Sequence, residues 1–182
     1  MTACSMFLFG LVALSLAVPV DSKERQMPRQ EVFTTFKKYE ALNADFLSSV
    51  GPGHGKSGKS YESLRREVET YAEGPYFKAL SAAEQLICAE KDGELLKSLF
   101  GIVLATRNSA SEVPAWTLGR VFVCQPDLVE SELRNLSPAD QREIYGEISF
   151  GFENVMHRSP KGDERANLLR LKLRTIEPKI AR

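Results

Sequence analysis

Residues 94–107 read ELLKSLFGIVLATR, and this stretch decides the fold. Its apolar side chains lie on all sides of a helical wheel, whereas a helix at a protein surface keeps them on one stripe. Asp92-Gly93 precedes the stretch and marks a break between two segments. We therefore expect a central, buried helix around which the rest of the chain packs.

The flanking segments carry apolar residues at spacings of three and four, which is the period of an amphipathic helix. This pattern predicts helices over 32–50, 60–73, 75–91, 111–124, 126–136, 137–155 and 163–176. Gly74-Pro75 is expected to end the second of these helices, and Ser111 is expected to cap the helix at 111–124. Alternation at Leu169, Leu171 and Leu173 leaves a short strand as an alternative in the last segment.

No segment combines β-branched runs with hairpin turns, so the sequence predicts an all-α fold, a compact antiparallel domain of seven or eight helices. The helix lengths and proline-containing turns resemble those of HEAT-type paired helices, although no repeat period is legible. Four glycines fall inside the expected helices: Gly101, Gly119, Gly146 and Gly151. Each weakens its helix, so we expect them to allow close helix–helix approach, with a functional cleft as the alternative.

The N-terminal twenty residues contain no charged side chain. The apolar run over 7–18 has the length of a secretory signal rather than of a membrane span, and Ser15-Leu16-Ala17 has the small residues of a cleavage site. We expect a signal peptide over 1–17, a polar leader over 18–30 and one domain over 31–182. The protein would then be periplasmic or secreted, with no stable membrane insertion. Because no basic residue precedes the run, an uncleaved inner-membrane anchor is the alternative.

The composition is that of a folded soluble domain, with 43% hydrophobic and 26% charged residues. A net charge of zero argues against nucleic-acid binding. The charge is uneven: residues 84–153 hold 12 acidic and 6 basic side chains, whereas residues 157–182 hold 3 acidic and 8 basic ones. Either the acidic body neutralises the basic tail, or Arg170, Lys172 and Arg174 form a docking surface for an acidic partner.

Cys4 lies in the expected signal, which leaves Cys88 and Cys124 as an even pair. In an oxidising compartment this pair forms either one disulfide, which would stabilise the fold by about 3 kcal/mol, or two buried thiols. His54 and His157 have no cysteine or histidine neighbour at metal-ligand spacing. We therefore expect no metal site and no cofactor.

A glycine-rich loop over 51–59 separates the first two expected helices. Together with the next residue it matches the phosphate-binding pattern G-x-x-x-x-G-K-[ST] through Gly53, Gly58, Lys59 and Ser60. A phosphate-binding loop follows a β-strand, however, whereas residues 46–50 continue a helical stripe. We interpret the loop as flexible and basic and the match as a decoy, so nucleotide binding is only a third hypothesis.

Trp116 and Arg120 are four residues apart on one expected helix, so the guanidinium can cover the indole. This pair is typical either of a binding hot spot or of a half-buried helix contact. No local catalytic motif is present. The sequence therefore favours an exported, non-enzymatic protein that binds another protein, similar in general profile to bacterial immunity proteins. A hydrolase with a cleft lined by carboxylates from different helices is the alternative.

Overall fold

A computed structural model describes residues 27–50, 60–107, 111–157 and 163–178 of the chain. These residues form α-helices and one π-helical turn, with no β-strand among them. The elements are α1 (Arg29–Val50), α2 (Tyr61–Tyr71), the π-helical turn η1 (Ala72–Tyr76), α3 (Phe77–Glu90), α4 (Gly93–Ala105), α5 (Val113–Cys124), α6 (Pro126–Arg134), α7 (Pro138–Met156) and α8 (Glu164–Thr175). The all-α prediction is confirmed, and the alternative of a strand at 169–173 is wrong because these residues continue α8.

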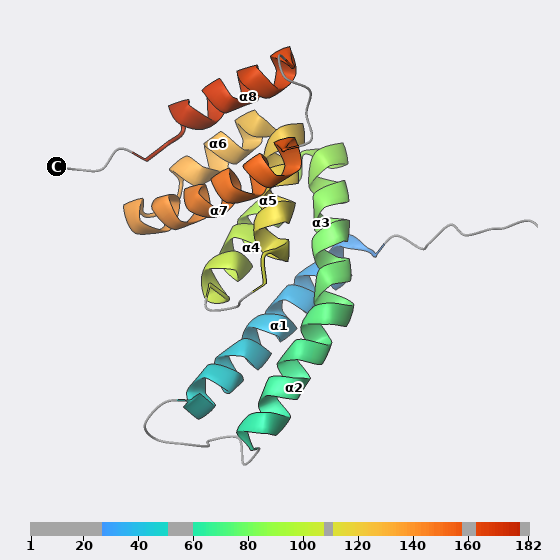
Figure 1. Cartoon of the computed structure of the whole chain (residues 1–182). Coiled ribbons are helices and arrows are strands. Elements are labelled where there is room, and N and C mark those ends of the chain that lie inside the picture. Colours follow the sequence, from blue (N-terminus) through green and yellow to red (C-terminus); the bar gives the residue numbers. More distant parts are fainter. Residues whose placement is uncertain (1–26, 51–59, 108–110, 158–162, 179–182) are drawn as a thin grey trace, which may run out of the picture.

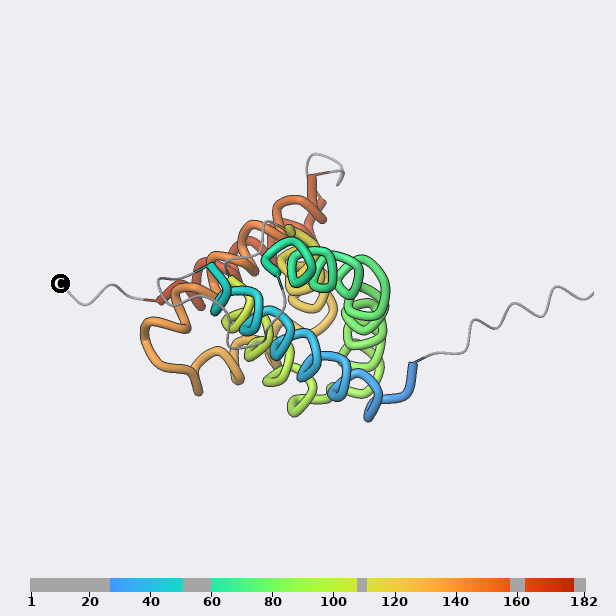
Figure 2. Tube along the Cα trace, turned by 90° about the horizontal axis from the view of Figure 1, so that it is seen from below, coloured from blue at the N-terminus to red at the C-terminus, as the bar shows by residue number. Residues whose placement is uncertain are grey.

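The helices form a bundle from which a hairpin extends (Figure 1). The hairpin consists of α1 and α2, and α3 leads from it back into the bundle. Seen from below, α1 runs alongside α4 (Figure 2). Helix α1 contacts both α3 and α4. Helices α6, α7 and α8 lie at the far end of the bundle, where α8 is outermost. None of the helices in the described stretches is long and apolar enough to cross a membrane.

Helix α4 lies at the centre of the core, as the sequence predicts. Leu95, Leu96, Leu99 and Phe100 are all fully buried. Neighbouring helices complete the core with large apolar side chains, among them Ile87, Leu118, Phe122, Ile148 and Phe152. Apolar side chains on nearly every side of α4 are therefore buried in the core.

Polar side chains begin four of the helices. Ser60, Asp92, Ser137 and Asp163 each accept a hydrogen bond from the backbone N–H three residues later. Such caps satisfy N–H groups that lack a partner inside the helix. The predicted cap at Ser111 is wrong in register, because α5 begins after Glu112 and Ser111 accepts from the Val113 N–H instead. Pro114 in the first turn fixes the start of α5 one residue later than the serine suggests.

The expected helix end at Gly74-Pro75 is also wrong, because the chain stays helical from α2 through η1 into α3. Pro75 has no N–H to donate and its ring crowds an α-helical turn. The chain widens instead of breaking: the Phe77 N–H donates to the Ala72 carbonyl, the i to i−5 bond of a π-turn. The continuous helix ends only at Lys91, whose φ of 55° is left-handed.

The π-turn places two tyrosines on the same side of the helix. Tyr71 and Tyr76 both stack on Tyr39 of α1, with ring centroids 6.4 Å and 3.9 Å away. Residues five apart face different directions in an α-helix, whereas a turn closed by an i to i−5 bond brings them closer to alignment. The widened turn thus creates the aromatic stack that joins the base of the hairpin to the bundle.

Candidate functional site

The closest helix contact in the described chain lies where α5 crosses α7. A Cβ atom on Gly151 would overlap the carbonyl group of Ala115, and one on Gly119 would overlap the backbone of Gly151 and Phe152. Only glycine permits two helix backbones to approach this closely. Two of the four predicted packing glycines therefore serve that purpose, whereas a Cβ on Gly101 or Gly146 would meet nothing within 4 Å.

Helix α5 is also fixed to α3. Cys88 and Cys124 form a disulfide with a Cα–Cα distance of 5.6 Å. One turn before Cys124, the Arg120 Nε donates to Glu84 of α3 at 2.6 Å. The Gln125 side-chain amide donates to the Cys88 carbonyl at 2.8 Å. A covalent bond, an ion pair and a backbone-to-backbone crossing thus hold α5 in place.

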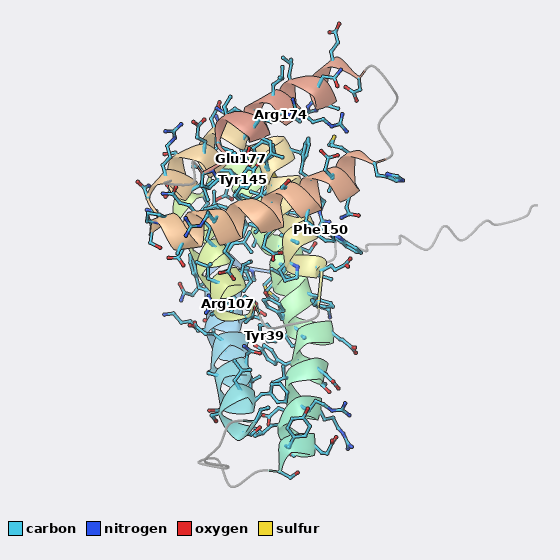
Figure 3. All side chains as sticks on the ribbon, turned by 60° about the vertical axis from the view of Figure 1, so that its left-hand side comes forward. Tyr39, Arg107, Tyr145, Phe150, Arg174 and Glu177 are labelled. Carbon is cyan, nitrogen blue, oxygen red and sulfur yellow. A yellow bond between two sulfur atoms is a disulfide. The ribbon has the colours of Figure 1, made fainter. Side chains whose placement is uncertain are left out.

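Two large aromatic side chains lie exposed at this crossing. Trp116 of α5 is 39% exposed, and Phe150 of α7 is 45% exposed. Each is next in sequence to a contact residue, Trp116 to Ala115 and Phe150 to Gly151. Leu118 and Ile148, each two residues away on the same helices, are buried, so Trp116 and Phe150 each point away from the buried face of their own helix. Figure 3 shows Phe150 on the part of α7 that lies against α5. We call these two exposed side chains, Trp116 and Phe150, the aromatic surface.

Carboxylates flank both rings. Glu112 lies one helical turn before Trp116, and Glu147 lies one turn before Phe150. Burial raises the pKa of Glu147 above its usual value, and the nearby Glu143 carboxylate raises it further. Glu143 itself pairs with Arg107 at 3.2 Å. The aromatic surface therefore has an acidic border whose Glu147 carboxylate lacks good solvation in the unbound protein.

The predicted stacking of Arg120 on Trp116 is not formed. The cation–π contacts found among the described residues include Arg29 with Phe33 and Lys38 with Tyr71, whereas Arg120 has no such contact with Trp116. Arg120 instead reaches across to Glu84, because a partly buried guanidinium gains more from a carboxylate than from a ring. Trp116 stays exposed as the hot-spot interpretation requires, but Arg120 positions α5 rather than extending the aromatic surface. Phe150 was missed because its neighbour Phe152 continues the buried stripe and Phe150 does not.

The basic tail largely folds back on the acidic body. Lys172 pairs with Asp127 at 2.8 Å and also with Glu130, both on α6. Arg170 pairs with Glu153 of α7 at 3.5 Å. Arg174 pairs with no carboxylate of the described residues, and it opposes the rise in the pKa of Tyr145 that burial and Glu177 cause. Of the three residues predicted to dock an acidic partner, two are therefore engaged within the molecule.

The phosphate-loop decoy lies almost entirely outside the described residues. Gly53, Gly58 and Lys59 fall in 51–59, so their arrangement is not described, whereas Ser60 is the N-cap of α2. The segment that precedes the loop is helix up to Val50. A phosphate-binding loop needs a strand at this point, and the described chain provides none.

The grooves on the described surface include three between or beside helices. The larger two flank the hairpin, with volumes of about 690 Å³ and 480 Å³, and the third lies between α6 and the end of α8. Glu147, the one described carboxyl group with a raised pKa, lines none of them. No group of three or more histidine, cysteine or acidic side chains in the described residues has the arrangement of a metal site. No protein-family model, no curated protein and no solved structure matches this chain.

Proposed function

We propose that the chain is an exported, non-enzymatic protein that binds another protein through the aromatic surface. One observation carries the proposal: Trp116 and Phe150 are both exposed on either side of a rigid helix crossing. Exposed tryptophan and phenylalanine side chains are enriched in the centres of protein interfaces. Because a disulfide and two glycines already fix α5, binding would cost little conformational entropy.

The border of the aromatic surface indicates the chemistry of the partner. Glu112 and Glu147 flank the rings, and the segment 84–153 carries a net charge of −6, from 12 acidic and 6 basic side chains. A partner with an apolar side chain for the rings and a lysine or arginine for the carboxylates would be complementary. In this arrangement the chain supplies the acidic groups and the partner supplies the basic ones. The basic-tail hypothesis has these charges the other way round.

The proposal includes export by a signal peptide over 1–17 and a paired-helix organisation of the HEAT kind. The resemblance to bacterial immunity proteins is one of general profile, since such proteins are small, helical and without catalytic residues. It supports the idea of a tightly bound protein partner but names none.

Affinity capture from the periplasmic or secreted fraction of the source cell tests the proposal. The bait is the chain from Val18 onward, compared with W116A/F150A and with the control Y61A, which removes an exposed ring from the hairpin. We expect one protein to be retained by the wild type and Y61A. W116A/F150A should lose it, because truncating a hot-spot residue costs about 2 kcal/mol or more, roughly 30-fold in Kd. Equal retention by all three baits would contradict the proposal.

The pH dependence of binding gives a second test. Ionised Glu147 is the form that attracts a basic group. Because the pKa of this carboxyl is raised, it takes up its proton at a higher pH than an ordinary glutamate does. Binding should therefore weaken as the pH falls through the raised pKa, and E147Q should remove that part of the dependence. Titration calorimetry of the captured partner between pH 7.5 and pH 5 measures it, and an unchanged profile in E147Q would exclude Glu147 from the interface.

A further inference from the structure

The groove of about 690 Å³ lies along the hairpin, where α1 and α2 run side by side (Figure 1). Helix α1 contributes Lys38 and Leu42, which are one turn apart on the same face. On the other side the lining runs from Ser60, the N-cap of α2, to Tyr71 and Pro75. Ser60 and Tyr71 are about 16 Å apart along the helix, so the groove follows the length of α2. Its volume is in the range of small-molecule sites.

Part of the groove lining is apolar. Leu42 and Tyr71 are half-buried, so each packs into the hairpin while part of its side chain stays open to the groove. Pro75 is exposed at the base of the groove and belongs to the π-turn η1. Widened turns of this kind are rare and occur frequently at functional sites. Leu42, Tyr71 and Pro75 therefore offer a contact surface to the apolar part of a ligand.

Two cations from different helices line the same groove. The Lys38 ammonium lies over the Tyr71 ring, 5.0 Å from its centroid. Arg66 lies five residues before Tyr71, about 7 Å nearer the tip of the hairpin. Neither Lys38 nor Arg66 pairs with a carboxylate of the described chain. Both positive charges are therefore available to an anion in the groove.

The two carboxylates that line the groove are already engaged. Glu62 pairs with Arg65 at 3.2 Å, and Arg65 itself lines the second groove beside the hairpin. Glu67 is half-buried and makes an interaction of its own. The lining thus carries two charges of each sign, but the charges left without a carboxylate or cation partner are the positive ones, on Lys38 and Arg66.

We propose that this groove binds an amphipathic anion, a small molecule with an apolar body and one carboxylate, sulfate or phosphate group. The apolar body lies on Leu42, Tyr71 and Pro75, and the anionic group lies between Lys38 and Arg66. A ligand with only one of these two parts leaves half of the groove unmatched. The groove belongs to the hairpin, whereas the aromatic surface belongs to α5 and α7, so this site does not depend on the proposed function.

Titration of the isotope-labelled chain from Val18 onward with decanoate, followed by amide NMR shifts, tests the site. Decanoate combines an alkyl chain with one carboxylate. We expect the amides that border the groove on α1 and α2 to shift, with a Kd on the order of 100 µM for a ligand of this size. Acetate keeps the carboxylate without the chain, and decyltrimethylammonium keeps the chain without the anion. Each should bind about tenfold more weakly or worse, because each lacks one of the two contacts.

A pair of double variants tests the two cations. K38Q/R66Q should weaken decanoate binding about tenfold, because each exposed ion pair contributes a few-fold to the affinity. The matched control K37Q/R142Q removes the same charge from exposed residues outside the groove and should bind like the wild type. All four positions are exposed, so the melting curves of both variants should match that of the wild type.

Three results would overturn the proposal. The first is a wild type whose groove amides do not shift at about 1 mM decanoate, roughly ten times the expected Kd. The second is equal affinity of the two double variants for decanoate. The third is a set of shifts confined to α5 and α7, because decanoate would then bind at the aromatic surface and not in the groove.

Discussion

The α5–α7 crossing and the α1–α2 hairpin solve the same packing problem in opposite ways. At the crossing, Gly119 and Gly151 bring two backbones into contact without intervening side chains. At the base of the hairpin, Tyr39 of α1, Tyr71 of α2 and Tyr76 of η1 fill the space between the helices with stacked rings. The crossing thus depends on an absence of side-chain volume, and the hairpin depends on its presence.

This difference decides how each region tolerates substitution. Backbone atoms cannot move aside as a flexible side chain can, so an added methyl group at the crossing must separate the two helices. At the base of the hairpin, the packing consists of large rings, and not every hydroxyl on them is hydrogen-bonded. A hydroxyl can therefore be removed there with little loss of stability. The crossing also carries the aromatic surface, so its rigidity would serve the proposed binding as well as stability.

The largest effect is expected from G151A at the crossing. The added Cβ would overlap the Ala115 carbonyl, and we expect a loss of about 3 kcal/mol or more in the free energy of unfolding. The matched control is G146A on the same helix, where the new Cβ meets nothing within 4 Å. That variant should gain about 0.5–1 kcal/mol from the better helix propensity of alanine.

Urea unfolding followed by circular dichroism measures both glycine variants. A G151A protein as stable as G146A would show that the two backbones are not in contact. Addition of the same methyl group would then have the same effect at both positions, and the comparison between the crossing and the hairpin would fail.

The second-largest loss of unfolding free energy, after that of G151A, is expected from removal of the Cys88–Cys124 disulfide. The bond closes a loop across 36 positions, so C88A/C124A should lose about 3 kcal/mol. Reduction of the wild type by dithiothreitol should lower its stability by a similar amount and should leave the double variant unchanged. Equal urea midpoints for the oxidised wild type and the double variant would argue that the bond contributes nothing to the fold.

Much of the helical framework is predictable from the sequence because its signals are local. The helices predicted over 60–73, 137–155 and 163–176 begin at Ser60, Ser137 and Asp163, which are the N-caps of α2, α7 and α8, and the apolar stretch at 94–107 contains the buried helix α4. Periodicity and capping depend on residues within one or two turns, so one chain segment carries the whole signal.

The failures have long-range or backbone causes. Whether Gly74-Pro75 ends a helix or widens it depends on the rings of Tyr39 and Tyr76 that the π-turn brings together, and α1 lies far away in the sequence. Likewise, Arg120 has a choice between Trp116 on its own helix and Glu84 on α3, and only the fold decides it. The aromatic surface was half predicted, since Phe150 lies in a run where spacing alone cannot tell the inner ring from the outer one.

The smallest effect is expected from Y76F in η1, at the base of the hairpin. The Tyr76 ring is buried against Tyr39 and Phe36, and its hydroxyl makes no hydrogen bond of normal geometry, although Thr106 lies close enough to favour the ionised form slightly. A buried hydroxyl without a partner has lost its bonds to water, so its removal should stabilise the fold by up to about 1 kcal/mol. The rings remain, so the stack between α1 and η1 should persist.

The pH dependence sharpens this last prediction. Burial raises the pKa of Tyr76, Tyr39 adds to the shift and Thr106 opposes it only in part, so the folded protein keeps the phenol proton after the unfolded chain has released it. The wild type therefore loses stability as the pH rises through about 10, the ordinary tyrosine pKa, and Y76F lacks that loss. Urea unfolding at pH 7 and at pH 10.5 should show the advantage of Y76F increasing with pH. A variant less stable than the wild type at both values would mean that the hydroxyl does have a partner, and the hairpin would then have no more room for substitution than the crossing.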